Sequence, residues 1–153
     1  MYQKILAPLD GSDLAECALS HVKAIAAGCH VPEVILIGVV EPMVHLNQLR
    51  SELGEEWVRN AEKGMRTASE AYLTKKADAL KKDGIQAKVV VAEGIAADKI
   101  LEYAAKNKVD LIIMSSHGRS GIARWTMGSV TDRVVRHATA PVLTAAAPAC
   151  RVK

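Results

Sequence analysis

Hydrophobic residues fall into short continuous runs that are separated by segments of helical period. The runs are rich in Val, Ile and Leu and show no polar alternation, which is typical of parallel strands covered on both faces. We expect strands at Lys4–Leu9, Val34–Val40, Ala87–Val91 and Leu111–Ser115, with a weaker fifth at Val142–Ala145. Each run therefore predicts a buried strand of one sheet.

Between the runs, apolar residues recur every three to four positions, as on the buried face of a helix. These stripes lie at 14–25, 58–80, 97–104 and 130–137. Because strands and helices alternate along the whole chain, the pattern predicts the α/β class, with a mostly parallel sheet and right-handed crossovers. One connection, Glu41 to Gly84, spans 44 residues, and its first part, Pro42 to Gly54, has no clean pattern. A crossover of this length is often a lid or an interface element.

The size and composition fit a single folded domain. The chain has 153 residues, of which 50% are hydrophobic and 24% charged, and this excludes a disordered protein. The longest apolar run, Val34–Val40, has seven residues, far fewer than the ~20 that cross a bilayer. Pro8 and Asp10 come before an apolar region of the kind found in signal peptides could develop, so we expect a cytoplasmic protein without a membrane partner. Residues 1–147 would form the domain and residues 148–153 a short tail.

Charge and aromatic content limit the classes of ligand. Aromatic residues make up 3% of the chain and Phe is absent, so nucleic-acid readers that stack bases on aromatic side chains are excluded. The net charge is +3, and the segment Ser115–His137 alone holds four arginines against one acid, Asp132. This concentration favours a small anion over a long polyanion. The three cysteines are widely spaced and odd in number, which favours free thiols over a disulfide framework or a zinc knuckle.

The chemistry is expected where the parallel strands end, because open α/β sheets bind ligands beyond the carboxyl ends of their strands. After the first strand the chain reads Pro8-Leu9-Asp10-Gly11-Ser12-Asp13. Ser12 or Asp13 would cap the first helix and leave Asp10 at the strand exit. Alternatively, Asp10 serves only the turn, since Asp-Gly is a common turn pair.

A glycine-containing segment follows the fourth strand. Nine residues separate Gly118 from Gly128, and Gly128-Ser129 opens the last helix. Glycine allows backbone N–H groups to approach a phosphate, and a helix start offers free donors and the positive end of the helix dipole. Arg119 would add a charge-assisted bond, and His117 would orient the loop or contact the ligand. The alternative is an ordinary surface loop with a capped helix.

If this loop faces the first strand, the strand order is 3-2-1-4-5. No P-loop and no dinucleotide fingerprint after the first strand are present in the sequence, so those two nucleotide-binding classes are excluded. No metal site is expected from the isolated histidines.

The sequence resembles the universal stress protein family from Tyr2 to about Ala145. The opening Ile5-Leu6-Ala7-Pro8-Leu9-Asp10-Gly11-Ser12 is similar to the start of that family. The spacing Ser115-x-x-Gly118, nine residues, Gly128-Ser129 is similar to its ATP-binding signature. The closing His137–Leu143 resembles its last helix and strand. One departure is Ser115, which stands where the signature has its first glycine, and this is tolerable if the local φ is negative.

The resemblance implies a Rossmann-like open five-stranded parallel sheet of order 3-2-1-4-5 that binds ATP, with or without Mg²⁺. Matched position by position, the adenine and ribose would be bordered by Pro8, Leu9 and Asp10, with Val39 meeting the adenine through its backbone. The ribose and phosphates would be lined by Met114, Ser115, His117, Gly118 and Arg119, and the phosphate tail would be held by Gly128, Ser129, Val130 and Thr131. It also implies a homodimer through the edge strand Val142–Ala145.

Three functions remain open from the sequence. The first is a regulatory ATP-binding module of the stress response. The second is a slow ATPase or a phosphotransfer enzyme. The sequence disfavours efficient catalysis, because apart from Asp10 and Asp13 no acidic residue near the glycine loop is available to activate water or hold Mg²⁺. The third is a nucleotide-free dimeric interaction protein, against which Gly118, Gly128 and Ser129 argue.

Overall fold

The computed structural model describes residues 2–42, 51–117 and 127–146. Five strands form one parallel sheet. They are β1 (Lys4–Pro8), β2 (Glu33–Val40), β3 (Ala87–Glu93), β4 (Leu111–Ser115) and β5 (Val142–Ala145). The strand order β3-β2-β1-β4-β5 confirms the Rossmann-like arrangement expected from the sequence.

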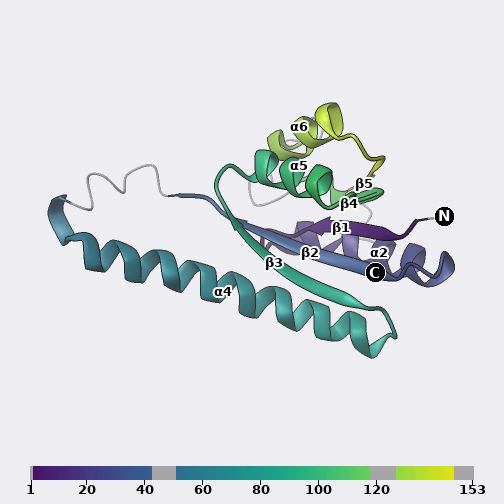
Figure 1. The fold of residues 1–153 in the computed structure, drawn as a ribbon, viewed down its shortest axis with the longest axis horizontal. Helices are drawn as coiled ribbons and strands as arrows, with labels where there is room; N and C mark the ends of the chain where they lie inside the picture. The colour runs from purple at the N-terminus through teal and green to yellow at the C-terminus, as the bar shows by residue number, and fades with distance from the viewer. Residues whose placement is uncertain (1, 43–50, 118–126, 147–153) are drawn as a thin grey trace.

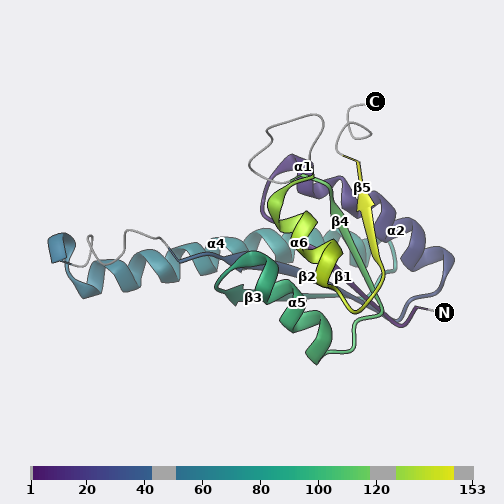
Figure 2. The same ribbon diagram turned by 90° about the horizontal axis from the view of Figure 1, so that it is seen from above.

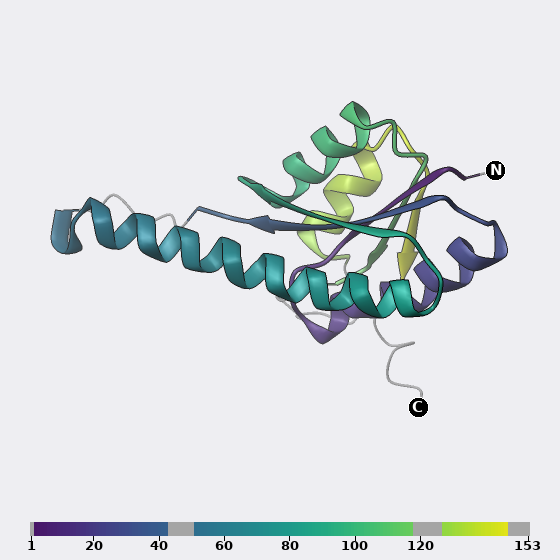
Figure 3. The same cartoon turned by 60° about the horizontal axis from the view of Figure 1, so that its bottom comes forward.

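Helices cover both faces of this sheet (Figures 1 and 3). The described helices are α1 (Asp13–Glu16), α2 (Ala18–Gly28), α4 (Glu55–Lys82), α5 (Ala96–Lys106) and α6 (Ser129–His137). Helices α1, α2 and α4 pack on one face, whereas α5 and α6 pack on the other. The first apolar stripe is thus divided between two helices that meet at Cys17.

Successive residues of the inner strands enter opposite cores. In β2, Val34 and Leu36 belong to the core beneath α2 and α4, whereas Ile35 and Ile37 belong to the core beneath α5 and α6. All four are at most 1% exposed. Burial on both faces explains why these strands read as continuous apolar runs rather than alternating ones.

The long helix α4 is amphipathic mainly where it crosses the sheet. Its last third buries Leu73, Ala77 and Leu80 against the sheet, as the apolar stripe predicts. Its beginning extends beyond the body of the sheet (Figures 1 and 2), and there Trp57 remains 46% exposed. The helix therefore projects as an arm from the side of the domain.

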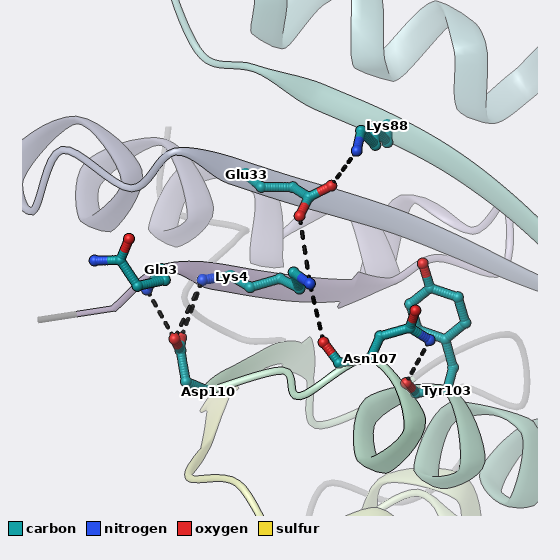
Figure 4. Close-up of polar contacts among 7 residues, drawn as sticks. All are labelled: Gln3, Lys4, Glu33, Lys88, Tyr103, Asn107 and Asp110. Carbon is teal, nitrogen blue, oxygen red and sulfur yellow. Dashed lines mark hydrogen bonds and ion pairs between the residues drawn. The ribbon is translucent and has the colours of Figure 1, made fainter.

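A polar network joins the amino ends of four strands (Figure 4). Glu33 at the start of β2 bridges Lys4 of β1 at 3.5 Å and Lys88 of β3 at 2.5 Å. Asp110, just before β4, accepts hydrogen bonds from the backbone N–H groups of Gln3 and Lys4. These contacts fasten the end of the sheet that lies opposite the strand exits.

The structure bears on the expectations about membrane spans and cysteines. Among the described helices, none is long and apolar enough to cross a membrane. The expectation of free thiols is wrong for Cys17, which is disulfide-bonded, while Cys29 is a free thiol. An odd number of cysteines excludes complete pairing, but it leaves room for one bridge.

Candidate functional site

A crevice of about 700 Å³ lies at the carboxyl ends of β1, β2 and β4. This is the place where the strand order reverses on either side of β1, as expected for a ligand site in an open α/β sheet. The structure brings into its wall every candidate residue that it describes: Pro8, Leu9, Asp10, Val39, Met114, Ser115, His117, Gly128, Ser129, Val130 and Thr131. Gly118 and Arg119 lie outside the described residues.

The crevice opens because β1 ends before its neighbour β2. The pairing of these two strands ends at Pro8 and Ile37, and the N–H of Leu9 donates to the carbonyl oxygen of Ile37 at 2.9 Å. Backbone groups of a strand face its two neighbours alternately, so the next residue of β2 to face β1 is Val39. Within the described chain, neither the N–H nor the C=O of Val39 has a partner on that side. Val39 therefore presents a free donor and a free acceptor side by side in the crevice wall.

On the other side of β1, the pairing with β4 ends early because β1 contains a proline. Pairing with β4 reaches only Leu6 and Ile112. Pro8 follows two residues later and has no N–H to continue a ladder. Pro8 therefore accounts for the gap between the carboxyl ends of β1 and β4.

Asp10 has a structural role at the strand exit. Its Oδ1 accepts from the N–H of Ser12 at 2.9 Å and from the Ser12 hydroxyl at 2.6 Å. The Ser12 oxygen in turn caps α1 by accepting from the N–H of Ala15 at 3.1 Å. The turn interpretation of Asp10 is therefore correct as far as it goes, and the carboxylate is also fixed in the crevice wall.

The start of α6 offers backbone donors to the same crevice. Its first intrahelical bond is from the N–H of Asp132 to the carbonyl oxygen of Gly128, at 2.8 Å. The N–H groups of the preceding helical residues 129–131 have no acceptor within the helix, and all three residues line the crevice. Gly128 occupies the cap position of α6, and no side chain caps this helix. The donors are thus left for a ligand or for water.

The side chain of Thr131 bonds α6 to the end of β4. Thr131 is buried and its hydroxyl donates to the carbonyl oxygen of Ser115 at 2.9 Å. Ser115 is itself buried, lies in regular strand conformation, and is not one of the described residues with positive φ. The condition under which serine is tolerated at the first signature position is therefore met. Next to it, the hydroxyl of Ser116 lies 3.0 Å from Nδ1 of His117.

Gly128 allows the loop and the helix start to approach closely. Its N–H donates to the carbonyl oxygen of Ser116 at 2.9 Å. A Cβ at this position would lie 3.3 Å from that same oxygen and 3.6 Å from Cα of His117. The close approach of the neighbouring backbone therefore favours glycine here, in addition to the ligand access inferred from the sequence.

Helix α4 supplies a wall of the crevice that the sequence analysis missed. The hydroxyl of Tyr72 donates to Oε1 of Glu16 at 3.0 Å, and Lys76 pairs with the other oxygen of Glu16 at 2.5 Å. Burial and the hydrogen bond to Glu16 raise the pKa of Tyr72 well above its usual range, so it stays neutral. Tyr72, Met65 and Ser69 come from the long crossover, and no local motif marks them as site residues.

A further missed residue is Glu41, directly after β2. Its Oε1 accepts from the N–H of Ala96 at 3.0 Å and so caps α5, whose own cap residue Ile95 provides no side-chain bond. The apolar floor beside it consists of Ile37, Ile100 and Met114. The sequence signal for Glu41 is a polar residue directly after an apolar strand, as at Asp10 after the first strand. Among the described residues, no group of three or more His, Cys, Asp or Glu side chains is arranged to hold a metal ion.

Comparison with known proteins agrees with this architecture. The model of the universal stress protein family matches residues 1–145. Universal stress protein MJ0531 of Methanocaldococcus jannaschii is 35% identical over 97% of this chain and 84% of its own length. Universal stress protein MJ0577 of the same organism is 34% identical over 94% of each chain.

Solved structures show the same fold. The structure of MJ0577 superposes with a TM-score of 0.82 at 32% identity, covering 95% of this chain and 96% of its own. A universal stress protein crystallised in complex with cAMP superposes with a TM-score of 0.67 at 24% identity, covering 95% of this chain and 98% of its own. Because the family model covers nearly the whole chain and two relatives are more than 30% identical over almost all of it, the chain belongs to the universal stress protein family.

Proposed function

We propose that this protein binds an adenine nucleotide, ATP, in the crevice and acts as a regulatory module. The observation that carries the proposal is that two sets of free backbone groups open into one crevice: the N–H and C=O of Val39, and the N–H groups at the start of α6. The first set suits the edge of a base, and the second suits a phosphate.

The base would lie between Val39 and the apolar floor of Ile37, Ile100 and Met114. Adenine presents an acceptor, N1, beside a donor, the 6-amino group. The Val39 N–H and C=O are the complementary pair. The ribose would then face Pro8, Leu9 and Asp10, which border the crevice at the end of β1.

The phosphates would lie at the start of α6. Three backbone N–H groups, those of residues 129–131, combine with the positive end of the helix dipole, which contributes ~0.3–1 kcal/mol for each charge. Gly118 and Arg119 would complete the phosphate contacts. Any Mg²⁺ would be held chiefly by the phosphates, with Asp10 as the carboxylate of the crevice wall.

A related protein supports an adenine nucleotide as the ligand class. The universal stress protein solved with cAMP shares this fold, and its ligand carries the same base. Within the described crevice no glutamate or second aspartate accompanies Asp10 near the start of α6. We therefore favour binding and regulation over efficient hydrolysis.

The test is calorimetric titration of the full chain with ATP, with ADP and AMP as comparisons. Mass spectrometry of small molecules released from the denatured protein would identify a ligand retained on purification. We expect saturable binding of ATP and recovery of an adenine nucleotide. A flat titration together with a preparation free of nucleotide would overturn the proposal.

We further propose that the protein forms a homodimer through β5. This strand ends the sheet and pairs with β4 on one side only. Its other side carries backbone N–H and C=O groups of the kind that pair with a second strand. Sedimentation equilibrium at micromolar concentration should give twice the chain mass of 16.4 kDa, and the single chain mass would contradict it.

A further inference from the structure

Glu41 lies beside the place proposed for the base, where its carboxylate can contact the edge of the base. It lines the crevice together with Val39, two residues before it, and with Ala96 and Ile100 of α5. Side chains alternate along an extended chain, so Val39 and Glu41 point toward the same face of the sheet. The contacts agree: Val39 packs in the core beneath α5 and α6, and Glu41 bonds to the start of α5.

The carboxylate of Glu41 is held in place by one oxygen. Oε1 accepts from the N–H of Ala96 at 3.0 Å, in the first turn of the 11-residue helix α5. The other oxygen, Oε2, has no donor among the described residues. A fixed carboxylate with one open acceptor atom is thus part of the wall beside Val39.

We propose that Glu41 is a specificity residue that selects purines bearing a 6-amino group. This inference rests on the proposed nucleotide function. The 6-amino group carries two N–H bonds: the C=O of Val39 would accept one, and Oε2 of Glu41 would accept the other, directly or through one water. A purine with a 6-oxo group, such as hypoxanthine, would instead place a carbonyl oxygen against a carboxylate.

Val39 and Glu41 have separable effects on the selectivity for adenine over hypoxanthine. The Val39 backbone already disfavours hypoxanthine, because that base has an N–H at N1 where adenine has an acceptor. Glu41 adds a charged acceptor. Placing it against the 6-oxo oxygen, a second acceptor, costs more binding free energy than the loss of one contact. Glu41→Gln replaces the carboxylate with a neutral amide. The ATP preference lost in this variant therefore measures the contribution of Glu41.

The experiment compares the dissociation constants of ATP and inosine triphosphate for the wild-type protein and for Glu41→Gln. Glutamine keeps an oxygen for the N–H of Ala96, and its amide NH₂ can donate to a 6-oxo group. We expect the ATP preference to fall about tenfold in Glu41→Gln, through weaker ATP and stronger inosine triphosphate binding. The melting temperature should stay within ~2 °C of wild type, since the helix cap remains.

Glu93→Gln is the matched control. Glu93 ends β3, pairs with Arg66 at 2.6 Å and is not part of the crevice wall. It loses the same charge and should leave the ATP preference unchanged. A preference within twofold of wild type in Glu41→Gln, with ATP still bound, would overturn the role of Glu41. Failure of the wild-type protein to bind either nucleotide would instead overturn the proposed function.

Discussion

The hydroxyl of Thr131, in the first turn of α6, donates to the carbonyl oxygen of Ser115, the last residue of β4, at 2.9 Å. Both residues are at most 4% exposed. This bond fixes the helix start relative to the strand end, and so it sets the position of the N–H groups that face the crevice. The phosphate end of the proposed site therefore depends on a buried contact that itself touches no ligand.

Replacing this hydroxyl should destabilise the domain and weaken binding together. Thr131→Val keeps the shape but leaves the buried carbonyl of Ser115 without its donor, at a cost of about 1–3 kcal/mol. Urea unfolding would measure the loss, and calorimetry would measure the accompanying decrease in ATP affinity. Thr131→Ser keeps the donor and is the control. Equal stability of the two variants would show that the bond contributes nothing.

Adding a methyl group at Gly128 should separate the helix start from the loop. A Cβ there would lie 3.3 Å from the carbonyl oxygen of Ser116, so the backbone must shift by a few tenths of an ångström. We expect Gly128→Ala to lower the free energy of unfolding by about 1 kcal/mol and the ATP affinity by roughly tenfold.

Gly64 provides the control for this substitution. It lies inside α4, and nothing stands within 4 Å of its added Cβ. Gly64→Ala should stabilise the protein by up to ~1 kcal/mol and leave ATP affinity unchanged. If Gly128→Ala behaved in the same way, the close approach at Gly128 would not constrain the site.

The two roles of Asp10 can be separated by paired substitutions. Asp10→Asn keeps an oxygen that accepts from Ser12 but removes the charge, whereas Asp10→Ala also removes the turn bonds. We expect Asp10→Asn to weaken ATP binding about fivefold with a melting temperature within ~2 °C of wild type. Asp10→Ala should lower both quantities. ATP affinity unchanged in Asp10→Asn would restrict Asp10 to the turn.

Glu33 should make the free energy of unfolding depend on pH in the acid range. Its hydrogen bond to Lys88 and the charges of Lys88 and Lys4 lower the pKa of Glu33 below its ordinary value of 4.5. A lowered folded-state pKa stabilises the protein above the unfolded-state value, and that contribution is lost as the pH falls through the folded-state pKa.

The variant Glu33→Gln tests this pH dependence. It should melt about 1–3 °C below wild type at neutral pH, and the difference should shrink as the pH falls below about 4.5 and disappear once the carboxyl group is protonated in the folded protein. Calorimetric scans across this range would measure it. ATP affinity should not change, because Glu33 lies at the amino end of the sheet (Figure 4). A difference that persisted undiminished in acid would contradict the role of the carboxylate charge.

Much of the fold followed from local patterns. Strands buried on both faces give continuous apolar runs, and the glycine segment after the fourth strand indicated which strand lies beside the first. They favoured the order β3-β2-β1-β4-β5 on the condition that this loop faces the first strand, and the family resemblance implied the same order. The break between α1 and α2 at Cys17 was missed, because apolar spacing continues across it at Leu14 and Ala18.

The crevice was predictable only where a strand exit marks it. Asp10 and Ser115 directly follow or end apolar strands, and parallel strands place such residues at one edge of the sheet. Tyr72 and Ser69 reach the crevice from the middle of α4, and their position depends on how that helix crosses the sheet. Tertiary packing sets such contacts. The helical period of the sequence does not reveal them, because it is the same whatever the helix packs against.

The most direct measurement of the central claim is a titration of the isotope-labelled protein with ATP, followed by the backbone amide resonances. If ATP binds in the crevice, the largest shifts should occur at the amides of Val39, Ser129 and Val130, with Lys88 at the far end of the sheet unaffected. Shifts that are absent, or that avoid both the end of β2 and the start of α6, would contradict it.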